Sequence, residues 1–339
     1  MTNRTELIVP SELSHYVDDT FLDAHLRWSQ ASVSSLQVPP LHHEPEEQSA
    51  GYGLFIPEGE YDRTDVIVSE FPLANDLGPN MTLRHRFLQM ILEKPTLIVA
   101  FPHNTRQAPD VYSLTPEENF DVYLGNLDSI VDRQFNALES LGVRRVRFVG
   151  DSVGSVIASQ FMARTARWQT PQKFDVGPSA LFEAVAVKKR DRKEVGQDFR
   201  AGGLSAFRDA VNESGIPLYS QIQCTRGGLD SIRMLGMLAS FRRNLNIKEN
   251  VALRGALRFS LLETALDDAL RHHFDLRLLL VNGQRSAMTP EKETMAMARE
   301  LIKTHVHVVP GRGHEIANHL PTFALLARLG LAGLVPRPR

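Results

Sequence analysis

Val-Arg-Phe-Val-Gly-Asp-Ser-Val-Gly, residues 146–154, is the stretch of sequence that decides the fold. In it a short apolar run ends in the pattern Gly150-x-Ser152-x-Gly154 and continues into a helix-like segment, Ser155 to Arg164. This order predicts a strand, a sharp turn and a helix, with a serine at the apex of the turn. The glycines meet a steric need, because a side chain at either position would collide with the neighbouring strand or helix. The serine hydroxyl is therefore expected at the carboxyl edge of a sheet, at the positive end of the following helix.

The five-residue pattern alone also fits an ordinary strand-to-helix turn that happens to contain small residues. Its surroundings favour a nucleophile, because a histidine, His314, comes much later, after a strand expected at 305–309 and a flexible Gly-Arg-Gly loop. A serine hydroxyl at neutral pH is a poor nucleophile and needs a base that removes its proton. An imidazole that leaves a strand on such a loop can fold back over the sheet edge that carries the serine. We therefore interpret Ser152 as the candidate nucleophile and His314 as its candidate base.

With these motifs the chain resembles proteins of the α/β-hydrolase fold, from about Val66 to Leu329. The resemblance implies an α/β protein with a mostly parallel central sheet, flanking helices and an inserted helical cap. We expect residues 1–65 to form an N-terminal segment packed on the core, with the cap at residues 188–273. The first part of the core then spans 66–187 and the second part 274–339. The cap begins where the apolar sequence changes to a solvated charge run, Lys-Lys-Arg-Asp-Arg-Lys, at 188–193.

Several further segments show the periodicity of regular structure. A Thr-Pro-Glu-Glu capping box at Thr115 to Glu118 predicts the start of one long helix that reaches Leu138. Other expected elements are strands at 65–71, 96–101, 180–187, 275–282 and 305–309, and helices at 291–303 and 322–329.

The resemblance also implies an oxyanion hole made of two backbone N–H groups. One is the N–H of Val153, directly after the candidate nucleophile. The other comes from the exit of the strand at 65–71, where many proteins of this fold have His-Gly and this chain has Phe-Pro. Because Pro72 has no N–H to donate, the role falls to Leu73 or to Ala74, and Leu73 is our choice.

The third member of the expected triad departs from the pattern of the resemblance. Proteins of this fold place an aspartate in Gly-x-x-Asp-x-x-x-Pro, after the strand that corresponds to 275–282. Here the aligned stretch is Gly-Gln-Arg-Ser-Ala-Met-Thr-Pro at 283–290, so that Ser286 stands at the position of the acid. A serine cannot stabilise an imidazolium with a full charge.

Three accounts of the missing acid are consistent with the sequence. In the first, the acid has moved to Glu183, at the end of the strand at 180–187, a relocation known in this fold. The competing explanation for this carboxylate is an ion pair with Arg190 or Arg192. In the second, the site is a Ser-His dyad in which Ser286 or water orients the ring. In the third, the site is inactive.

Composition limits the remaining classes. The chain has 339 residues, 42% hydrophobic content and a formal net charge of −2, which permits a substantial core and gives no reason to expect nucleic acid or an anionic membrane as partner. One cysteine, Cys224, cannot form an internal disulfide, and His42 and His43 lack a second ligand pair at metal spacing. Residues 1–30 show no apolar signal region, and no apolar run reaches the ~18 residues that span a bilayer. We expect a cytoplasmic protein without a cofactor or metal; the sequence does not indicate its oligomeric state.

The function that follows is that of a serine hydrolase, which cleaves an ester or related small acyl substrate through an acyl-enzyme. In this hypothesis Ser152 is the nucleophile, His314 the base and Glu183 the acid, and Val153 and Leu73 form the oxyanion hole. The alternatives are a catalytically impaired relative that acts as a binding or structural protein, and an acyltransferase that uses the same groups.

Overall fold

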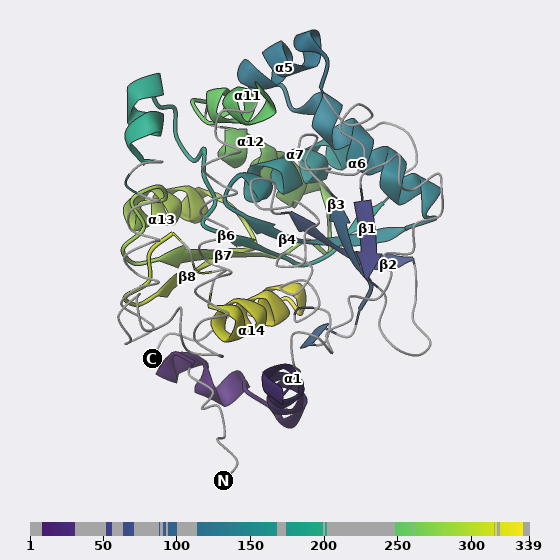
Figure 1. Cartoon of the computed structure of the whole chain (residues 1–339), viewed down its shortest axis with the longest axis vertical. Coiled ribbons are helices and arrows are strands. Elements are labelled where there is room, and N and C mark those ends of the chain that lie inside the picture. Colours follow the sequence, from purple (N-terminus) through teal and green to yellow (C-terminus); the bar gives the residue numbers. More distant parts are fainter. Residues whose placement is uncertain are drawn as a thin grey trace.

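The computed structural model shows a central sheet between two layers of helices (Figure 1). A helical layer containing α6 (Asp128–Ser140) and α7 (Val153–Arg167) covers one face, and α14 (Leu320–Leu331) covers the other. The structure describes residues 9–30, 52–55, 64–70, 88, 91–92, 94–99, 114–167, 174–198, 201, 248–259, 261–314, 316 and 319–334.

The sheet is mostly parallel, and its order places β4 (Arg145–Asp151) near the middle. Eight strands of the described part form it, in the order β1-β3-β2-β4-β6-β7-β8, and β5 pairs with β4 off this path. β1 is antiparallel to β3, and the other pairs are parallel. The remaining strands are β1 (Tyr52–Phe55), β2 (Asp65–Glu70), β3 (Thr96–Val99), β5 (Asp175–Val176), β6 (Ser179–Phe182), β7 (Leu278–Gly283) and β8 (Thr304–Val309).

The strands feed two separate hydrophobic cores because successive side chains of a strand point to opposite faces. In β7, Leu278 and Leu280 belong to one core, and Leu279 and Val281 belong to the other. Since both faces are covered there, β6 and β7 are buried along their whole length and consist mostly of apolar residues, which is typical of parallel sheets. Because β4, β6, β7 and β8 run parallel to one another, their carboxyl ends meet at one edge of the sheet.

The helices on the first face hold α7 firmly in place. The rings of Phe135 in α6 and Phe161 in α7 are stacked with centroids 4.2 Å apart, and Phe148 of β4 lies 5.2 Å from Phe161. On its other side α7 packs against α12 (Leu261–His272), whose apolar residues belong to the same core. The face also carries α11 (Lys248–Ala256) and α13 (Glu291–Glu300).

Helix α14 is enclosed on both sides. Six consecutive residues, 322 to 327, are fully buried, which a helix shows only when neighbours cover it all round. The sheet covers one side of α14. The N-terminal elements η1 (Ser11–Tyr16) and α1 (Asp19–Gln30) lie on the opposite side of this helix, away from the sheet (Figure 1). Leu13, Phe21 and Ala24 pack into the core around α14.

The prediction of a single long helix from Thr115 to Leu138 is wrong, because the structure has two helices there. The capping box forms as predicted, but the helix that it starts, α5, ends at Tyr123, and α6 begins at Asp128. Gly125, between the two, has a φ of 93°, and a Cβ there would lie 2.9 Å from the ring of Phe259. The helical spacing of apolar residues was misleading here, because Phe120 and Leu124 are exposed, whereas Val122 is the residue of α5 that is buried in the core.

The strand expected at 180–187 is shorter than predicted. β6 ends at Phe182, and the chain then turns at Glu183, whose φ is 47°. The strands expected at 65–71, 96–101, 275–282 and 305–309 are present as β2, β3, β7 and β8. The helices expected at 291–303 and 322–329 are present as α13 and α14.

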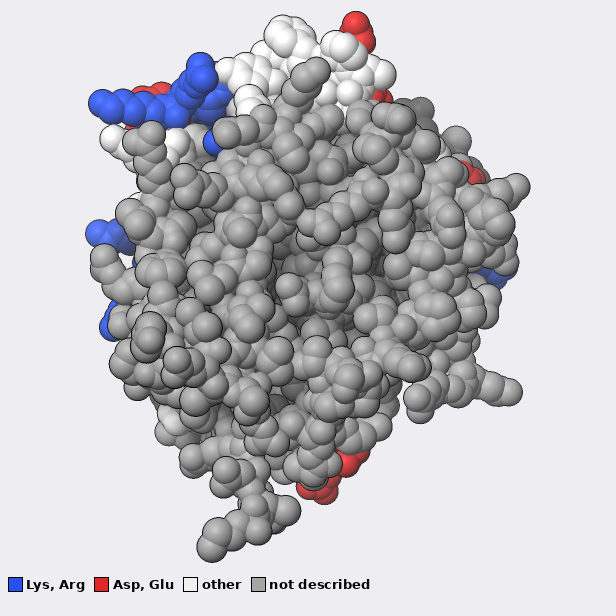
Figure 2. Space-filling view, in the orientation of Figure 1, with Lys and Arg blue, Asp and Glu red and all other residues white. Residues whose placement is uncertain are grey.

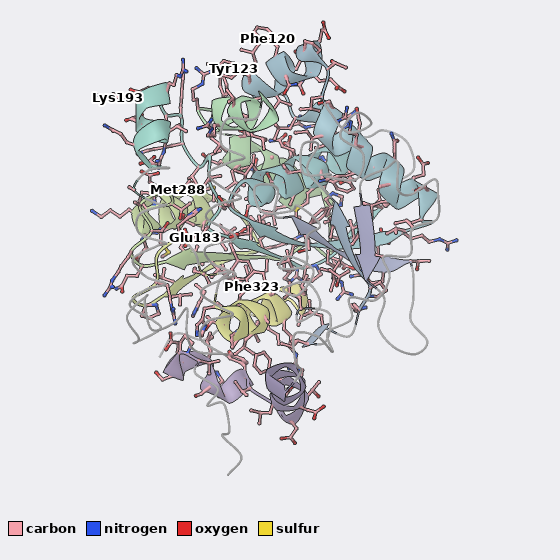
Figure 3. All side chains as sticks on the ribbon, viewed as in Figure 1. Phe120, Tyr123, Glu183, Lys193, Met288 and Phe323 are labelled. Carbon is pink, nitrogen blue, oxygen red and sulfur yellow. The ribbon has the colours of Figure 1, made fainter. Side chains whose placement is uncertain are left out.

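The predicted cap at residues 188–273 falls partly outside the described residues, and the domain boundaries stay predictions. Within it, the basic run at 188–193 is largely exposed, and α12 packs on α7. Figure 2 shows basic side chains on the surface at the upper left, where Figure 3 labels Lys193. None of the helices in the described ranges combines the length and apolar character needed to cross a bilayer.

Candidate active site

The turn after β4 projects Ser152 from the carboxyl edge of the sheet. Ser152 has a φ of 55°, in the left-handed region, and α7 begins at the next residue. Gly150 is required because a Cβ there would come within 2.9 Å of the Ser155 backbone. The Ser152 N–H donates to the carbonyl of Phe182, at 2.9 Å, and the Ser155 hydroxyl donates to the same carbonyl, at 3.1 Å. The turn is thereby tied to the last residue of β6.

The structure brings Ser152, His314 and Glu183 together in one hydrogen-bonded chain. Ser152 Oγ lies 3.0 Å from His314 Nε2, and His314 Nδ1 lies 2.9 Å from Glu183 Oε2. The three residues come from the end of β4, the loop after β8 and the end of β6. These positions are 162 and 131 residues from His314 along the chain, so only the sheet topology brings them into contact.

Glu183 is a fully buried carboxylate, with 0% of its surface exposed. Its oxygens accept hydrogen bonds from the N–H of Gly283 and the hydroxyl of Thr289, besides the contact with His314. Such donors offset the large cost of removing a charge from water. Figure 3 shows Glu183 beside β6, on the side of the strand toward α13.

The loop that carries His314 lies directly on the end of β7. A Cβ at Gly283 would come 2.1 Å from the carbonyl oxygen of Gly313 and 2.6 Å from that of Arg312. The Arg285 N–H donates to the Arg312 carbonyl at 2.7 Å. Because glycine at 283 permits this approach, the imidazole reaches the serine, and only 7% of the His314 surface stays exposed.

The predicted oxyanion hole falls partly outside the described residues. Val153 is the first residue of α7, so its N–H has no acceptor within the helix and lies at the positive end of the helix dipole. Leu73 and Ala74 lie outside the residues that the structure describes, as do His42 and His43. Within the described ranges, no group of three or more His, Cys, Asp and Glu side chains is placed to hold a metal ion.

Two findings go beyond the sequence analysis. Arg190, offered as a partner of Glu183, instead pairs with Asp198 and with Glu293 of α13. Thr289 contacts the carboxylate and was not predicted to do so. Its signal in the sequence is slight: a hydroxyl residue directly before Pro290, three positions after the serine that replaces the usual aspartate.

Comparison with known proteins adds to this geometry. No protein-family model matches the chain, and no curated protein does. Solved structures do match: MGS-M2, an α/β hydrolase from a Medee basin deep-sea metagenome library, is 17% identical with a TM-score of 0.55, over 84% of this chain and 94% of that one. The hydrolase olei00960 from Oleispira antarctica is 13% identical with a TM-score of 0.53, over 82% and 92% of the two chains. A bromoperoxidase from Bacillus anthracis is 16% identical with a TM-score of 0.52, over 82% and 94%.

The protein has the α/β-hydrolase fold. The predicted fold class is thereby confirmed, with its mostly parallel sheet and flanking helices. At these identities the likeness concerns the fold, and the reaction has to be argued from the site.

Proposed function

We propose that the protein is a serine hydrolase that cleaves an ester or related small acyl substrate through an acyl-enzyme. One observation carries the proposal: the continuous hydrogen-bonded chain from Ser152 through His314 to the buried Glu183. Nucleophile, base and orienting acid in this order make up the apparatus of acyl transfer.

In the first half of the reaction, the Ser152 oxygen attacks the carbonyl carbon while its proton passes to His314 Nε2. The carbonyl π electrons move to the oxygen, which becomes an oxyanion held by the N–H of Val153. When the oxyanion collapses, the bond to the leaving group breaks, and the imidazolium returns its proton to that group. Glu183 stabilises the imidazolium and holds the ring in place.

In the second half, water takes the place of the leaving group. His314 removes a proton from the water, the hydroxide equivalent attacks the acyl carbon, and Ser152 leaves with the proton that His314 returns. The enzyme is regenerated and a carboxylic acid is released. An acceptor other than water would make the same apparatus an acyltransferase.

The alternative of a catalytically impaired binding protein had its main support in Ser286, at the usual position of the acid. The contact of Glu183 with His314 weakens that support, since a carboxylate reaches the imidazole from a neighbouring strand. The retained serine and histidine also favour an enzyme.

Covalent labelling tests the proposal. A fluorophosphonate probe phosphonylates an activated serine, and we expect one equivalent on Ser152 and release of p-nitrophenol from short acyl esters. Ser152→Ala should abolish both. The matched control is Ser159→Ala, which removes a buried hydroxyl of α7 that donates to the Val156 carbonyl. A folded wild-type protein that neither reacts with the probe nor turns over esters would favour the binding protein.

A further inference from the structure

Two hydroxyl side chains lie against the acid and the imidazole. Thr289 and Ser286 belong to the loop between β7 and α13 and are 1% and 8% exposed. The Thr289 hydroxyl donates to Glu183 Oε2. The two hydroxyl oxygens are 2.8 Å apart, and Ser286 Oγ lies 3.4 Å from His314 Nδ1.

Each hydroxyl has one hydrogen to donate, and this sets the direction of the bonds. Thr289 gives its hydrogen to the carboxylate, so in its bond with Ser286 it accepts, and Ser286 donates. With its hydrogen committed, Ser286 offers only lone pairs to His314 Nδ1. That nitrogen therefore faces two acceptors, Glu183 Oε2 and Ser286 Oγ.

A ring nitrogen that faces two acceptors carries the proton. In the neutral ring, Nε2 then has the lone pair, directed at the Ser152 hydroxyl 3.0 Å away. This is the tautomer that a general base for Ser152 requires.

The backbone around Thr289 is itself fixed. The side-chain amide of Asn282, in β7, donates to the Thr289 carbonyl at 2.9 Å and to Thr294 Oγ1 of α13 at 2.9 Å. Asn282 is fully buried. The strand and the helix together hold the Thr289 hydroxyl under the carboxylate.

We propose that Thr289 is a positioning residue of the active site, which acts through Glu183, and that Ser286 sets the direction of its hydroxyl. Together they hold Glu183 Oε2 against His314 Nδ1 and select the tautomer in which Nε2 carries no proton. The position that holds the acid in other proteins of this fold thus supplies an acceptor and a donor in place of a charge. This inference rests on the proposed function of the same site.

The test compares Thr289→Val, which keeps the shape and removes the hydroxyl, with Thr289→Ser, which keeps the hydroxyl. We expect Thr289→Val to slow fluorophosphonate labelling roughly tenfold, the usual effect of losing a hydrogen bond to a charged group. Thr289→Ser should label at close to the wild-type rate. Thr165→Val is the matched control, because Thr165 is also buried and bonds to His273 and to the Met162 carbonyl, away from the site. It should lower the melting temperature and leave labelling unchanged.

Nitrogen NMR of histidine-labelled protein supplies a second readout, which a merely structural role would not move. In wild type the His314 proton should reside on Nδ1, and Thr289→Val should shift that resonance. If Thr289→Val fails to fold, Ser286→Ala takes its place, with a smaller loss of rate expected. A folded Thr289→Val that labels as fast as wild type, with the same resonance, overturns the inference alone. A wild-type protein that does not label overturns the proposed function and this inference with it.

Discussion

Ser152 and Glu183 share a backbone conformation that residues with a side chain rarely adopt. Their φ angles are 55° and 47°, and each residue directly follows one of two paired parallel strands, β4 and β6. Such conformations cost on the order of 1–3 kcal/mol each and persist where the surroundings impose them. Here the shared Phe182 carbonyl and the donors around Glu183 do so. The strain therefore coincides with two of the three members of the hydrogen-bonded chain.

Replacement of the Glu183 carboxylate by an amide should slow the reaction. Glu183→Gln should lower kcat for ester hydrolysis on the order of 10³–10⁴-fold, because the amide removes the charge and offers hydrogens to Nδ1. KM should change little, since Glu183 faces the ring and not the substrate. Ester kinetics measure both constants.

Glu293→Gln is the control, since it makes the same chemical change on α13, where the carboxylate pairs with Lys188 and Arg190. It should reduce stability and leave kcat unchanged. Equal rates for Glu183→Gln and wild type would remove Glu183 from the mechanism.

At this scale the sequence allowed part of the site to be anticipated. Ser152 stood out by its flanking glycines, and Glu183 by its charge within an apolar run. The choice among the three accounts of the acid depended on contacts across more than 100 residues, which no local pattern encodes. The contact of the Thr289 hydroxyl with Glu183 was not predicted for the same reason. The local sequence contained no further indication, because threonine before a proline is common in loops.

Among the elements, α14 shows how much of a helix's surroundings its own sequence can predict. Its sequence is apolar on every side, which indicates enclosure but does not say by what. The covering elements, η1 and α1, come from the other end of the chain, and a bidentate ion pair joins them to α14. Arg328 Nη1 donates to Asp18 Oδ1 at 2.8 Å, and Nη2 donates to Oδ2 at 2.5 Å. The break between α5 and α6, in contrast, depends on one glycine within an unbroken apolar pattern.

The ion pair yields a prediction for pH dependence. Arg328 lowers the pKa of Asp18 to about 2, from 3.8. Because the folded pKa is depressed, the stabilisation is present above about pH 4 and is lost as the pH falls to about 2. The pair is partly exposed to solvent, so we expect Asp18→Asn to lower the free energy of unfolding at pH 7 by only about 0.5–1 kcal/mol.

Urea denaturation of wild type and Asp18→Asn at pH 7 and near pH 2 checks this expectation. The difference between the two proteins should vanish at the lower pH. A difference that persists there would mean that the substitution acts through packing and not through charge.

The whole molecule contains histidines that folding keeps neutral. Burial, with a smaller contribution from Arg312, lowers the pKa of His319 to about 4, and burial also lowers the pKa values of His273 and His307. In the unfolded chain these rings take up protons near pH 6.5, so below that pH the unfolded state binds more protons than the folded state. The free energy of unfolding should therefore fall as the pH drops from about 6.5 towards 4, with His319 contributing up to roughly 3 kcal/mol.

Chemical denaturation between pH 7.5 and 4.5 measures this slope. His319→Gln should flatten it, and His305→Gln, at an exposed position of β8, is the matched control. Identical slopes for His319→Gln and wild type would exclude His319 as a source of the acid sensitivity.

For the molecule as a whole, the sheet class and the helical layers followed from the sequence. The apolar runs, the sharp turn at Ser152 and the late histidine are sufficient for that, because parallel strands with both faces covered have a distinctive composition. The sequence indicated an N-terminal segment packed on the core, but it did not indicate that η1 would lie against α14, because that contact joins residues about 300 positions apart in the sequence.

The placement of the three members of the hydrogen-bonded chain has a consequence for thermal inactivation. Ser152 and Glu183 directly follow neighbouring strands that share hydrogen bonds, whereas His314 lies on the loop after β8, which the Arg285–Arg312 backbone hydrogen bond holds to the end of β7. Warming that loosens this loop separates the base from its two partners while the sheet stays intact. Under the proposed roles, the protein should lose its hydrolytic activity at a temperature several degrees below its melting temperature. Cooling should restore this activity.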